Sequence, residues 1–162
     1  MPDSILLVDD EEAVLDAFQT LLTRNGYLVR SAPDLTSVES ACSCSTYSVA
    51  IVDLTLAGGE REGMEVLRYL TRQAARPRII VWSGRSTDDV KERVLNAGAD
   101  IFLAKPVAFN MLMERIHELL RPMPHRVQQE NAQLGPAPAV PSLLPRPTQA
   151  MPQIFLPAAP IR

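Results

Sequence analysis

The sequence is poor in cysteine, has no long apolar run and carries no excess of positive charge. Its two cysteines, Cys42 and Cys44, fall short of the roughly four ligands that a structural zinc ion needs. We expect reduced thiols, with a redox role as the alternative. No apolar run approaches bilayer-spanning length, and the first, residues 5–8, ends at four consecutive acids, so no signal peptide is predicted. The net charge of −3 does not favour a general nucleic-acid-binding surface. We therefore expect a cytoplasmic protein that contacts neither membrane nor nucleic acid directly.

Proline is scarce before residue 122 and abundant after it, since ten of the fourteen prolines lie in residues 122–162. The charge changes at the same place, from a net −5 over residues 1–122 to +2 over residues 123–162. Proline at this density continues neither a helix nor a central strand. We predict one compact domain, residues 1–121, followed by a proline- and alanine-rich disordered tail, residues 122–162. The apolar residues 151–157 are a possible docking motif, although a flexible tail is the simpler interpretation.

Five short apolar runs alternate with five segments whose apolar residues recur at helical spacing. Asp34 is predicted to cap the second helix, and Gly26 to end the first. The apolar runs, which we interpret as strands, are residues 4–8, 27–30, 47–52, 78–82 and 100–103. Alternation with short connections predicts an α/β fold with a parallel sheet covered by helices on both faces. Continuous apolar strands agree with burial on both faces.

Polar side chains lie at the ends of four of these strands. Asp9 and Asp10 follow the first run, Asp53 ends the third, Ser83 follows the fourth, and Lys105 comes shortly after the fifth. Because the carboxyl ends of parallel strands share one edge of the sheet, we expect these side chains to line one crevice. Three carboxylates at close range repel one another unless a cation lies among them. Oxygen ligands with room for water favour Mg²⁺ or Mn²⁺ over zinc.

A lysine and a hydroxyl beside such a metal site suit the binding of a phosphoryl group. Lys105 and Ser83 would contact phosphoryl oxygens, and Asp53 would be the nucleophile that forms an acyl phosphate. Each residue alone has an ordinary explanation, because acids are common at helix starts and serine is common in turns. The prediction depends on their joint occurrence at the ends of different strands.

With these motifs, the sequence resembles the receiver domain of bacterial two-component response regulators. The resemblance covers about residues 3–121 and keeps the order and spacing of four motifs: LLVDDE at 6–11, VDL at 52–54, VWSG at 81–84 and GADIFLAKP at 98–106. It implies a flavodoxin-like fold, with the five strands in the order 2-1-3-4-5. It also implies that Asp53 accepts a phosphoryl group from a histidine kinase or a phosphotransfer protein.

The resemblance assigns roles to the other site residues. Ser83 and Lys105 would bind the phosphoryl oxygens, and the peptide bond before Pro106 would be cis. The implied Mg²⁺ ligands are Asp9, Asp10, Asp53 and the backbone carbonyl of Thr55. Phe102 would rotate inward as Ser83 moves, which would reshape the fourth helix, fifth strand and fifth helix. The output would pass to protein partners or to a phosphorylation-dependent homodimer. The chain would not be an enzyme beyond its own phosphoryl transfer and dephosphorylation.

The segment after Asp53 departs from the family pattern. The family places a proline four residues and a glycine eight residues after its aspartate, whereas this chain has Ala57 and then Gly63, ten residues on. We expect residues 54–62 to form a glycine-rich loop that is two residues longer than usual. The resemblance implies that Thr55 and Arg85 lie at positions where family members tune the access of water to the acyl phosphate. We expect Arg85 to cover the phosphoryl group partly.

Two other functions fit parts of the pattern. A haloacid dehalogenase-like phosphatase also uses an aspartate nucleophile, but there the acidic pair comes last and a second aspartate follows two residues after the nucleophile. Here the acidic pair comes first, and that second position is Thr55. The other alternative is a pseudo-receiver that serves only as an interaction scaffold, which the altered segment after Asp53 leaves open.

Overall fold

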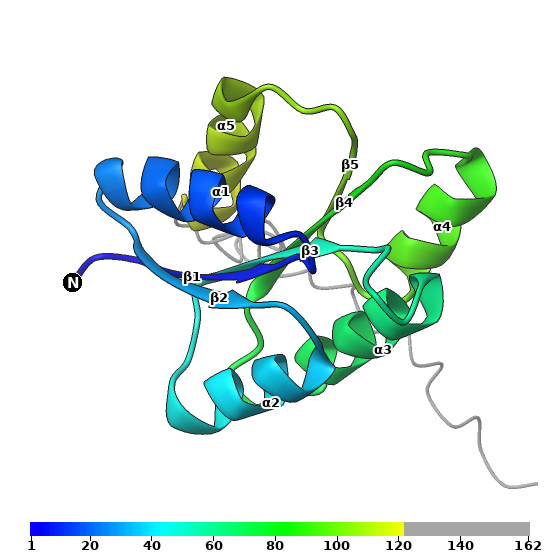
Figure 1. Cartoon of the computed structure of the whole chain (residues 1–162), viewed down its shortest axis with the longest axis horizontal. Coiled ribbons are helices and arrows are strands. Elements are labelled where there is room, and N and C mark those ends of the chain that lie inside the picture. Colours follow the sequence, from blue (N-terminus) through cyan, green and yellow to red (C-terminus); the bar gives the residue numbers. More distant parts are fainter. Residues whose placement is uncertain (122–162) are drawn as a thin grey trace, which may run out of the picture. The chain divides into compact units, whose positions relative to one another are not determined.

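The computed structural model describes residues 1–121, in which five strands and five helices alternate along the chain (Figure 1). The elements are β1 (Ser4–Val8), α1 (Glu12–Arg24), β2 (Leu28–Ala32), α2 (Leu35–Cys44), β3 (Val49–Asp53), α3 (Glu60–Thr71), β4 (Arg78–Ser83), α4 (Asp88–Asn96), β5 (Ile101–Ala104) and α5 (Phe109–Leu120). The predicted tail, residues 122–162, lies outside the described residues. Within residues 1–121, no helix is both long and apolar enough to cross a membrane.

The strands form one parallel sheet in the order β2-β1-β3-β4-β5, which confirms the predicted fold. Its register aligns the carboxyl ends of the strands. Val8 pairs with both Ala32 and Val52. Asp9 and Asp53, which follow Val8 and Val52 in the sequence, therefore lie at the same height along the sheet. Ser83 at the end of β4 pairs with Ala104 at the end of β5.

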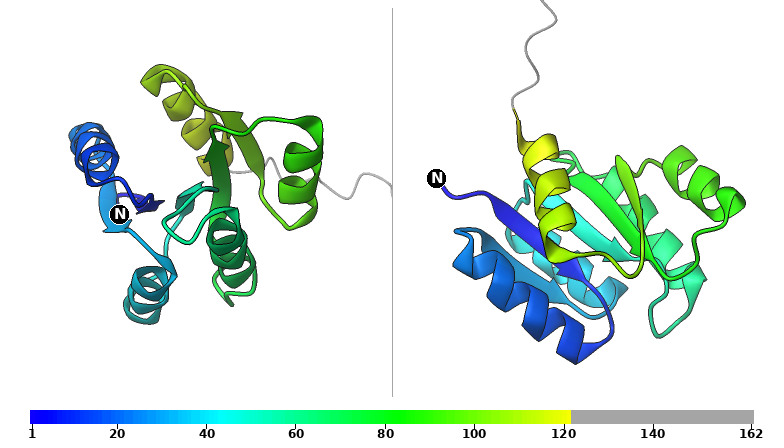
Figure 2. Two further views of the ribbon diagram at one scale, coloured as in Figure 1. Left: turned by 45° about the vertical axis from the view of Figure 1, so that its right-hand side comes forward. Right: turned by 90° about the horizontal axis from the view of Figure 1, so that it is seen from above.

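Helices cover both faces of the sheet (Figure 2). Helices α1 and α5 pack on one face, over the odd-numbered residues of β1 and β3. Helices α2, α3 and α4 pack over the even-numbered residues, which point to the other face. Every residue of β3 is buried, as expected of a central strand that has apolar side chains on both faces. This burial fixes the position of Asp53, the last residue of β3.

Local signals account for most of the element boundaries. The Asp34 carboxylate accepts a hydrogen bond of 2.7 Å from the Ser37 backbone N–H, which confirms the predicted helix cap. Gly26 ends α1 with a φ of 91°, which glycine adopts without the strain that a Cβ would bring. The second strand starts one residue later than predicted, because the N–H of Tyr27 is still bonded to Leu22 of α1.

Candidate functional site

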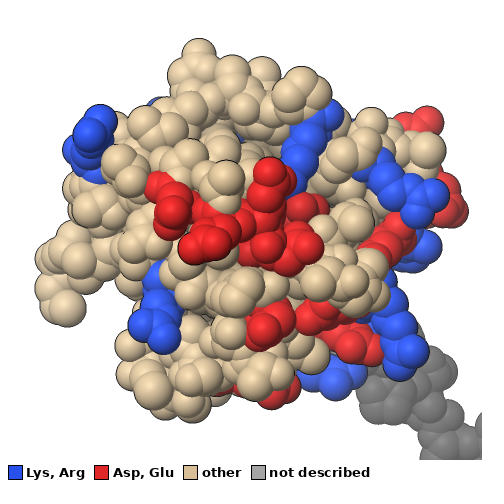
Figure 3. All heavy atoms as spheres, in the orientation of Figure 1, with Lys and Arg blue, Asp and Glu red and all other residues tan. Residues whose placement is uncertain are grey.

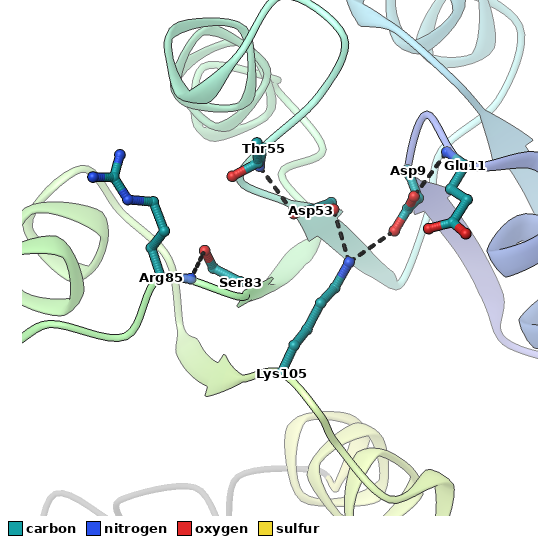
Figure 4. Close-up of polar contacts among 7 residues, drawn as sticks. All are labelled: Asp9, Glu11, Asp53, Thr55, Ser83, Arg85 and Lys105. Atoms are coloured by element: carbon teal, nitrogen blue, oxygen red, sulfur yellow. Dashed lines mark hydrogen bonds and ion pairs between the residues drawn. The ribbon is translucent and has the colours of Figure 1, made fainter.

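The aligned strand ends bring together the side chains that the sequence singled out (Figure 4). Asp9 directly follows β1, Asp53 ends β3 and Ser83 ends β4. Lys105 follows β5, and its peptide bond to Pro106 is cis. Asp9, Asp53 and Ser83 are the buried polar residues of the described chain. The buried central strands thus hold these side chains in place at one edge of the sheet.

Lys105 connects the carboxylates of β1 and β3. Its Nζ lies 2.8 Å from Asp53 Oδ2 and 3.2 Å from Asp9 Oδ2 (Figure 4). The same ammonium lies 4.5 Å from the ring centroid of Trp82, a distance at which the aromatic face attracts a cation. Lys105 is therefore held between two carboxylates and an aromatic ring, which fixes its charge beside Asp53.

The environment shifts the pKa values of this pair. Burial raises the pKa of Asp53 above its ordinary value, and hydrogen bonds from the Lys105 ammonium and the Thr55 backbone N–H offset only part of this effect. For Lys105, burial alone lowers the pKa, but the hydrogen bonds and charges of Asp53 and Asp9 together outweigh burial, so that the pKa rises overall. The lysine therefore stays protonated at neutral pH and can neutralise an anion at Asp53.

Three carboxylates can share a cation here. Asp9, Asp10 and Asp53 each offer an oxygen, and these oxygens lie within 4.8 Å of one another. Acidic side chains also collect near the middle of the face drawn in Figure 3. Asp10 is exposed, which leaves room for metal-bound water. The donors are hard oxygens without sulfur or imidazole nitrogen, so the residues fit Mg²⁺ better than Zn²⁺.

The backbone N–H groups of Thr55 and Glu11 hold the carboxylates of Asp53 and Asp9 in place. The Thr55 N–H donates to Asp53 Oδ1 at 2.9 Å, and the Glu11 N–H donates to Asp9 Oδ1 at the same distance (Figure 4). The Thr55 side chain is exposed. The role of the Thr55 carbonyl as a metal ligand stays a prediction.

Ser83 and Phe102 are the two residues of the predicted switch. The Ser83 side chain is fully buried, and its Oγ accepts a hydrogen bond of 3.1 Å from the Arg85 backbone N–H (Figure 4). Phe102, on β5, is partly buried and packs against the apolar core beneath α2, α3 and α4. Their movement on phosphorylation stays a prediction.

Arg85 does not lie over Asp53 in this structure. Its side chain is largely exposed and points away from the carboxylates (Figure 4), with one guanidinium nitrogen 3.2 Å from Glu60 Oε2. Partial covering of a phosphoryl group by Arg85 therefore stays a prediction, and it requires this ion pair to open.

The segment after Asp53 is shorter than the predicted loop. Helix α3 begins at Glu60, so the predicted loop of residues 54–62 ends three residues early. The glycines fold the chain back on itself, with the Gly59 N–H donating to the Leu56 carbonyl at 2.7 Å. Gly63 is the fourth residue of α3, and a Cβ there would overlap the backbone carbonyl of Leu54. Gly63 thus lets the helix pack directly on the chain that follows Asp53.

Sequence reasoning did not identify every residue that surrounds the site. Trp82 is buried in the core, and its ring also contacts the Lys105 ammonium. Its buried indole N–H has no hydrogen-bond partner among the described residues. Glu60 and Arg93 form an ion pair that no motif indicated. An acid in the first turn of a helix was the one available signal for Glu60, and that signal is common at ordinary helix starts.

The fold and this site define a class of protein. A five-stranded parallel sheet that presents an acidic cluster and a lysine at its carboxyl edge is the architecture of receiver domains in bacterial signalling. The model of the response regulator receiver domain family matches residues 5–117. The chain belongs to this family.

Individual relatives agree with this assignment. The regulatory protein VirG of Agrobacterium tumefaciens (strain 15955) is 32% identical over 127 residues, which cover 78% of this chain and 47% of VirG. The response regulator MprA of Mycobacterium sp. (strain KMS) is 36% identical over 123 residues, which cover 75% of this chain and 52% of MprA. The chain thus spans about half the length of the curated relatives it matches.

Solved structures show the same fold. A CheY-like response regulator receiver domain protein from Methanospirillum hungatei JF-1 is 30% identical, with a TM-score of 0.67, over 73% of this chain and 93% of that protein. The BeF3-activated receiver domain of Klebsiella pneumoniae RstA is 22% identical, with a TM-score of 0.67, over 74% of this chain and the whole of that domain.

Proposed function

We propose that this receiver accepts a phosphoryl group on Asp53 from the phosphohistidine of a histidine kinase or a phosphotransfer protein. The observation that carries the proposal is the position of the Lys105 ammonium, which contacts Asp53 and Asp9 at the edge of the sheet. A fixed cation next to a buried carboxylate suits the charge that spreads over a transferring phosphoryl group.

The reaction transfers a phosphoryl group from the phosphohistidine to the carboxylate of Asp53. An Asp53 oxygen forms a bond to phosphorus while the phosphorus–nitrogen bond of the phosphohistidine breaks, and the electron pair of that bond stays with the imidazole. Lys105 and Ser83 bind oxygens of the phosphoryl group and so offset its charge. Mg²⁺, when bound by Asp9, Asp10, Asp53 and the Thr55 carbonyl, would neutralise further negative charge and orient the phosphoryl group. Hydrolysis of the acyl phosphate later restores the carboxylate.

The proposed output is a change of protein partners. The Ser83 hydroxyl moves toward the phosphoryl group, Phe102 turns inward, and the surface formed by α4, β5 and α5 changes. That surface would contact a downstream protein or a second phosphorylated copy. The protein is then a cytoplasmic switch that catalyses only its own phosphoryl transfer and dephosphorylation. Residues 1–121 would form the switch.

A pseudo-receiver is the second candidate, and the composition of the site argues against it. A scaffold has no need for the phosphoacceptor, the metal ligands, the hydroxyl and the lysine, and this chain has all of them: Asp9, Asp10, Asp53, Ser83 and Lys105. The altered segment after Asp53 still positions the Thr55 N–H on the acceptor carboxylate.

Intact-mass analysis tests the proposal. The protein is incubated with Mg²⁺ and acetyl phosphate, which replaces the kinase as phosphoryl donor. The expected result is the gain of one phosphoryl mass, absent from Asp53→Asn and absent when Mg²⁺ is chelated. If the wild-type protein gains no mass, or if Asp53→Asn gains it equally, the proposal is wrong.

A further inference from the structure

Helix α3 begins with a charged residue that connects three separate elements. Glu60, the first residue of α3, forms ion pairs with Arg85 in the β4–α4 loop and with Arg93 in α4. We call this group of three residues, Glu60, Arg85 and Arg93, the Glu60 clamp. Its members are separated by up to 33 residues in the sequence, so only the fold brings them together.

The clamp adjoins the predicted switch. The Arg85 backbone N–H donates to Ser83 Oγ (Figure 4). The Arg85 side chain forms an ion pair with Glu60. The Glu60 side chain is only 20% exposed, whereas those of Arg85 and Arg93 are 72% and 47% exposed. The carboxylate is thus the enclosed centre of the clamp, and the two arginines approach it from the solvent side. A movement of Ser83 that carries residues 84–87 along would displace Arg85 and so strain its ion pair with Glu60, while Arg93 ties α4 to the same carboxylate.

We propose that the Glu60 clamp holds the β4–α4 loop and α4 in the arrangement of the unphosphorylated protein, so that Glu60 is a positioning residue that opposes the switch. This inference rests on the proposed function of Asp53. A phosphoryl group there would have to draw Ser83 and its loop inward against the clamp. Loss of the Glu60 charge would lower that cost and make the phosphorylated arrangement easier to reach.

A simpler role for Glu60 has to be separated from this one. An acid in the first turn stabilises a helix through its interaction with the helix dipole, and Glu60 does this for α3 wherever the arginines lie. That role would affect the start of α3 and leave α4 unchanged. Glu65, one turn further along α3, provides a matched control because it forms an exposed ion pair with Arg61 away from the β4–α4 loop.

Hydrogen exchange without any phosphoryl donor tests the clamp itself. In Glu60→Gln and in Arg93→Gln, backbone amides of residues 84–93 are expected to exchange several times faster than in the wild type. Glu65→Gln is expected to match the wild type there. If Glu60→Gln changes exchange only at the start of α3, the residue acts on its own helix and the proposal is wrong.

Binding of beryllofluoride in the presence of Mg²⁺ tests the connection to Asp53. This anion binds without covalent transfer, and Trp82, the single tryptophan of the chain, reports it by fluorescence because its ring contacts Lys105. Exposed ion pairs contribute modestly, so Glu60→Gln is expected to tighten binding roughly threefold to tenfold, and Glu65→Gln less than twofold. This increase in beryllofluoride affinity should be smaller when Glu60→Gln is made in an Arg93→Gln background. It should also be smaller at 1 M salt, where exposed charges are screened.

The two measurements keep the proposals apart. If the wild type neither gains phosphoryl mass nor binds beryllofluoride, the proposed function of Asp53 is wrong. The clamp then opposes no switch, even if hydrogen exchange shows that its ion pairs form. If the wild type binds but Glu60→Gln binds equally or more weakly, Asp53 keeps its role and the proposed effect of Glu60 is overturned. An increase in beryllofluoride affinity of Glu60→Gln that is unchanged at high salt would also contradict a clamp made of ion pairs.

Discussion

Lys105 Nζ lies 2.8 Å from Asp53 Oδ2, although 52 positions separate the two residues in the sequence. The contact joins the end of the central strand to the loop after the edge strand β5. It places a protonated amine beside the carboxylate that we propose as phosphoryl acceptor, and burial of both groups strengthens the interaction between them.

Removal of the Lys105 charge should slow phosphorylation. Lys105→Met keeps most of the aliphatic stem but leaves the phosphoryl charge without its fixed cation. Loss of one such electrostatic contact typically slows a reaction by about a hundredfold. The rate of labelling by acetyl phosphate, followed by intact mass, is therefore expected to fall about a hundredfold. Lys91→Met, on the exposed side of α4, is the control and should label like the wild type. Labelling of Lys105→Met at the wild-type rate would exclude a role for the ammonium.

Asp53→Asn should stabilise the fold at neutral pH. Because burial raises the pKa of Asp53, the folded protein holds this proton more tightly than the unfolded chain does. The resulting stabilisation is complete below the unfolded pKa of about 3.9 and is lost as the pH rises through the folded pKa. The neutral asparagine avoids this loss, so Asp53→Asn should be more stable than the wild type at pH 7, and its advantage should shrink toward pH 4. Urea unfolding at several pH values measures the difference.

Asp34→Asn is the matched control for this pH dependence, with the opposite sign. Hydrogen bonds from Ser37 lower the pKa of Asp34, so its carboxylate stabilises the fold above the unfolded pKa. Asparagine still caps the helix but carries no charge. Asp34→Asn should therefore be less stable than the wild type at pH 7, and the difference should disappear as the pH falls. Equal pH trends in the two variants would show that the environment of Asp53 does not disfavour its charge.

Mg²⁺ should raise the thermal stability of the protein. Binding to the folded state alone adds about 1.4 kcal/mol at a free Mg²⁺ concentration ten times the dissociation constant. Differential scanning calorimetry with increasing Mg²⁺ is expected to show a rising Tm in the wild type and a much smaller rise in Asp10→Asn. Glu12→Gln, an exposed acid in the first turn of α1, should respond like the wild type. Equal shifts in all three proteins would indicate general charge screening instead of a site.

Gly63→Ala should destabilise the protein even though alanine favours helices. Alanine gains about 1 kcal/mol in helix propensity, but its Cβ would overlap the Leu54 carbonyl, and overpacking typically costs about 1 to 3 kcal/mol. The net effect should be a loss of stability together with slower labelling, because Leu54 directly follows the acceptor. Gly84→Ala is the control, since a Cβ there meets no atom within 4 Å. A stabilised Gly63→Ala would mean that α3 shifts freely, and the close packing at Leu54 would then be irrelevant to the site.

Sequence pattern alone predicted the parallel sheet and the convergence of the site residues. This succeeded because two-sided burial requires continuous apolar strands, and because parallel strands end at one edge. Residues placed at the ends of such strands or directly after them, Asp53 and Asp9 among them, had to come close together. The resemblance to receiver domains added the strand order and the cis peptide before Pro106, and both are present in the structure.

Only the tertiary structure determined which side chains meet across the loops. The start of α3 at Glu60, the packing of Gly63 on Leu54 and the position of Arg85 on Glu60 all depend on how far the chain turns after Asp53. Hydrophobic periodicity does not encode that geometry, because the turn is short, rich in glycine and not repetitive. Exposed arginines have several acids within reach, and the choice among them depends on backbone positions that the rest of the fold determines.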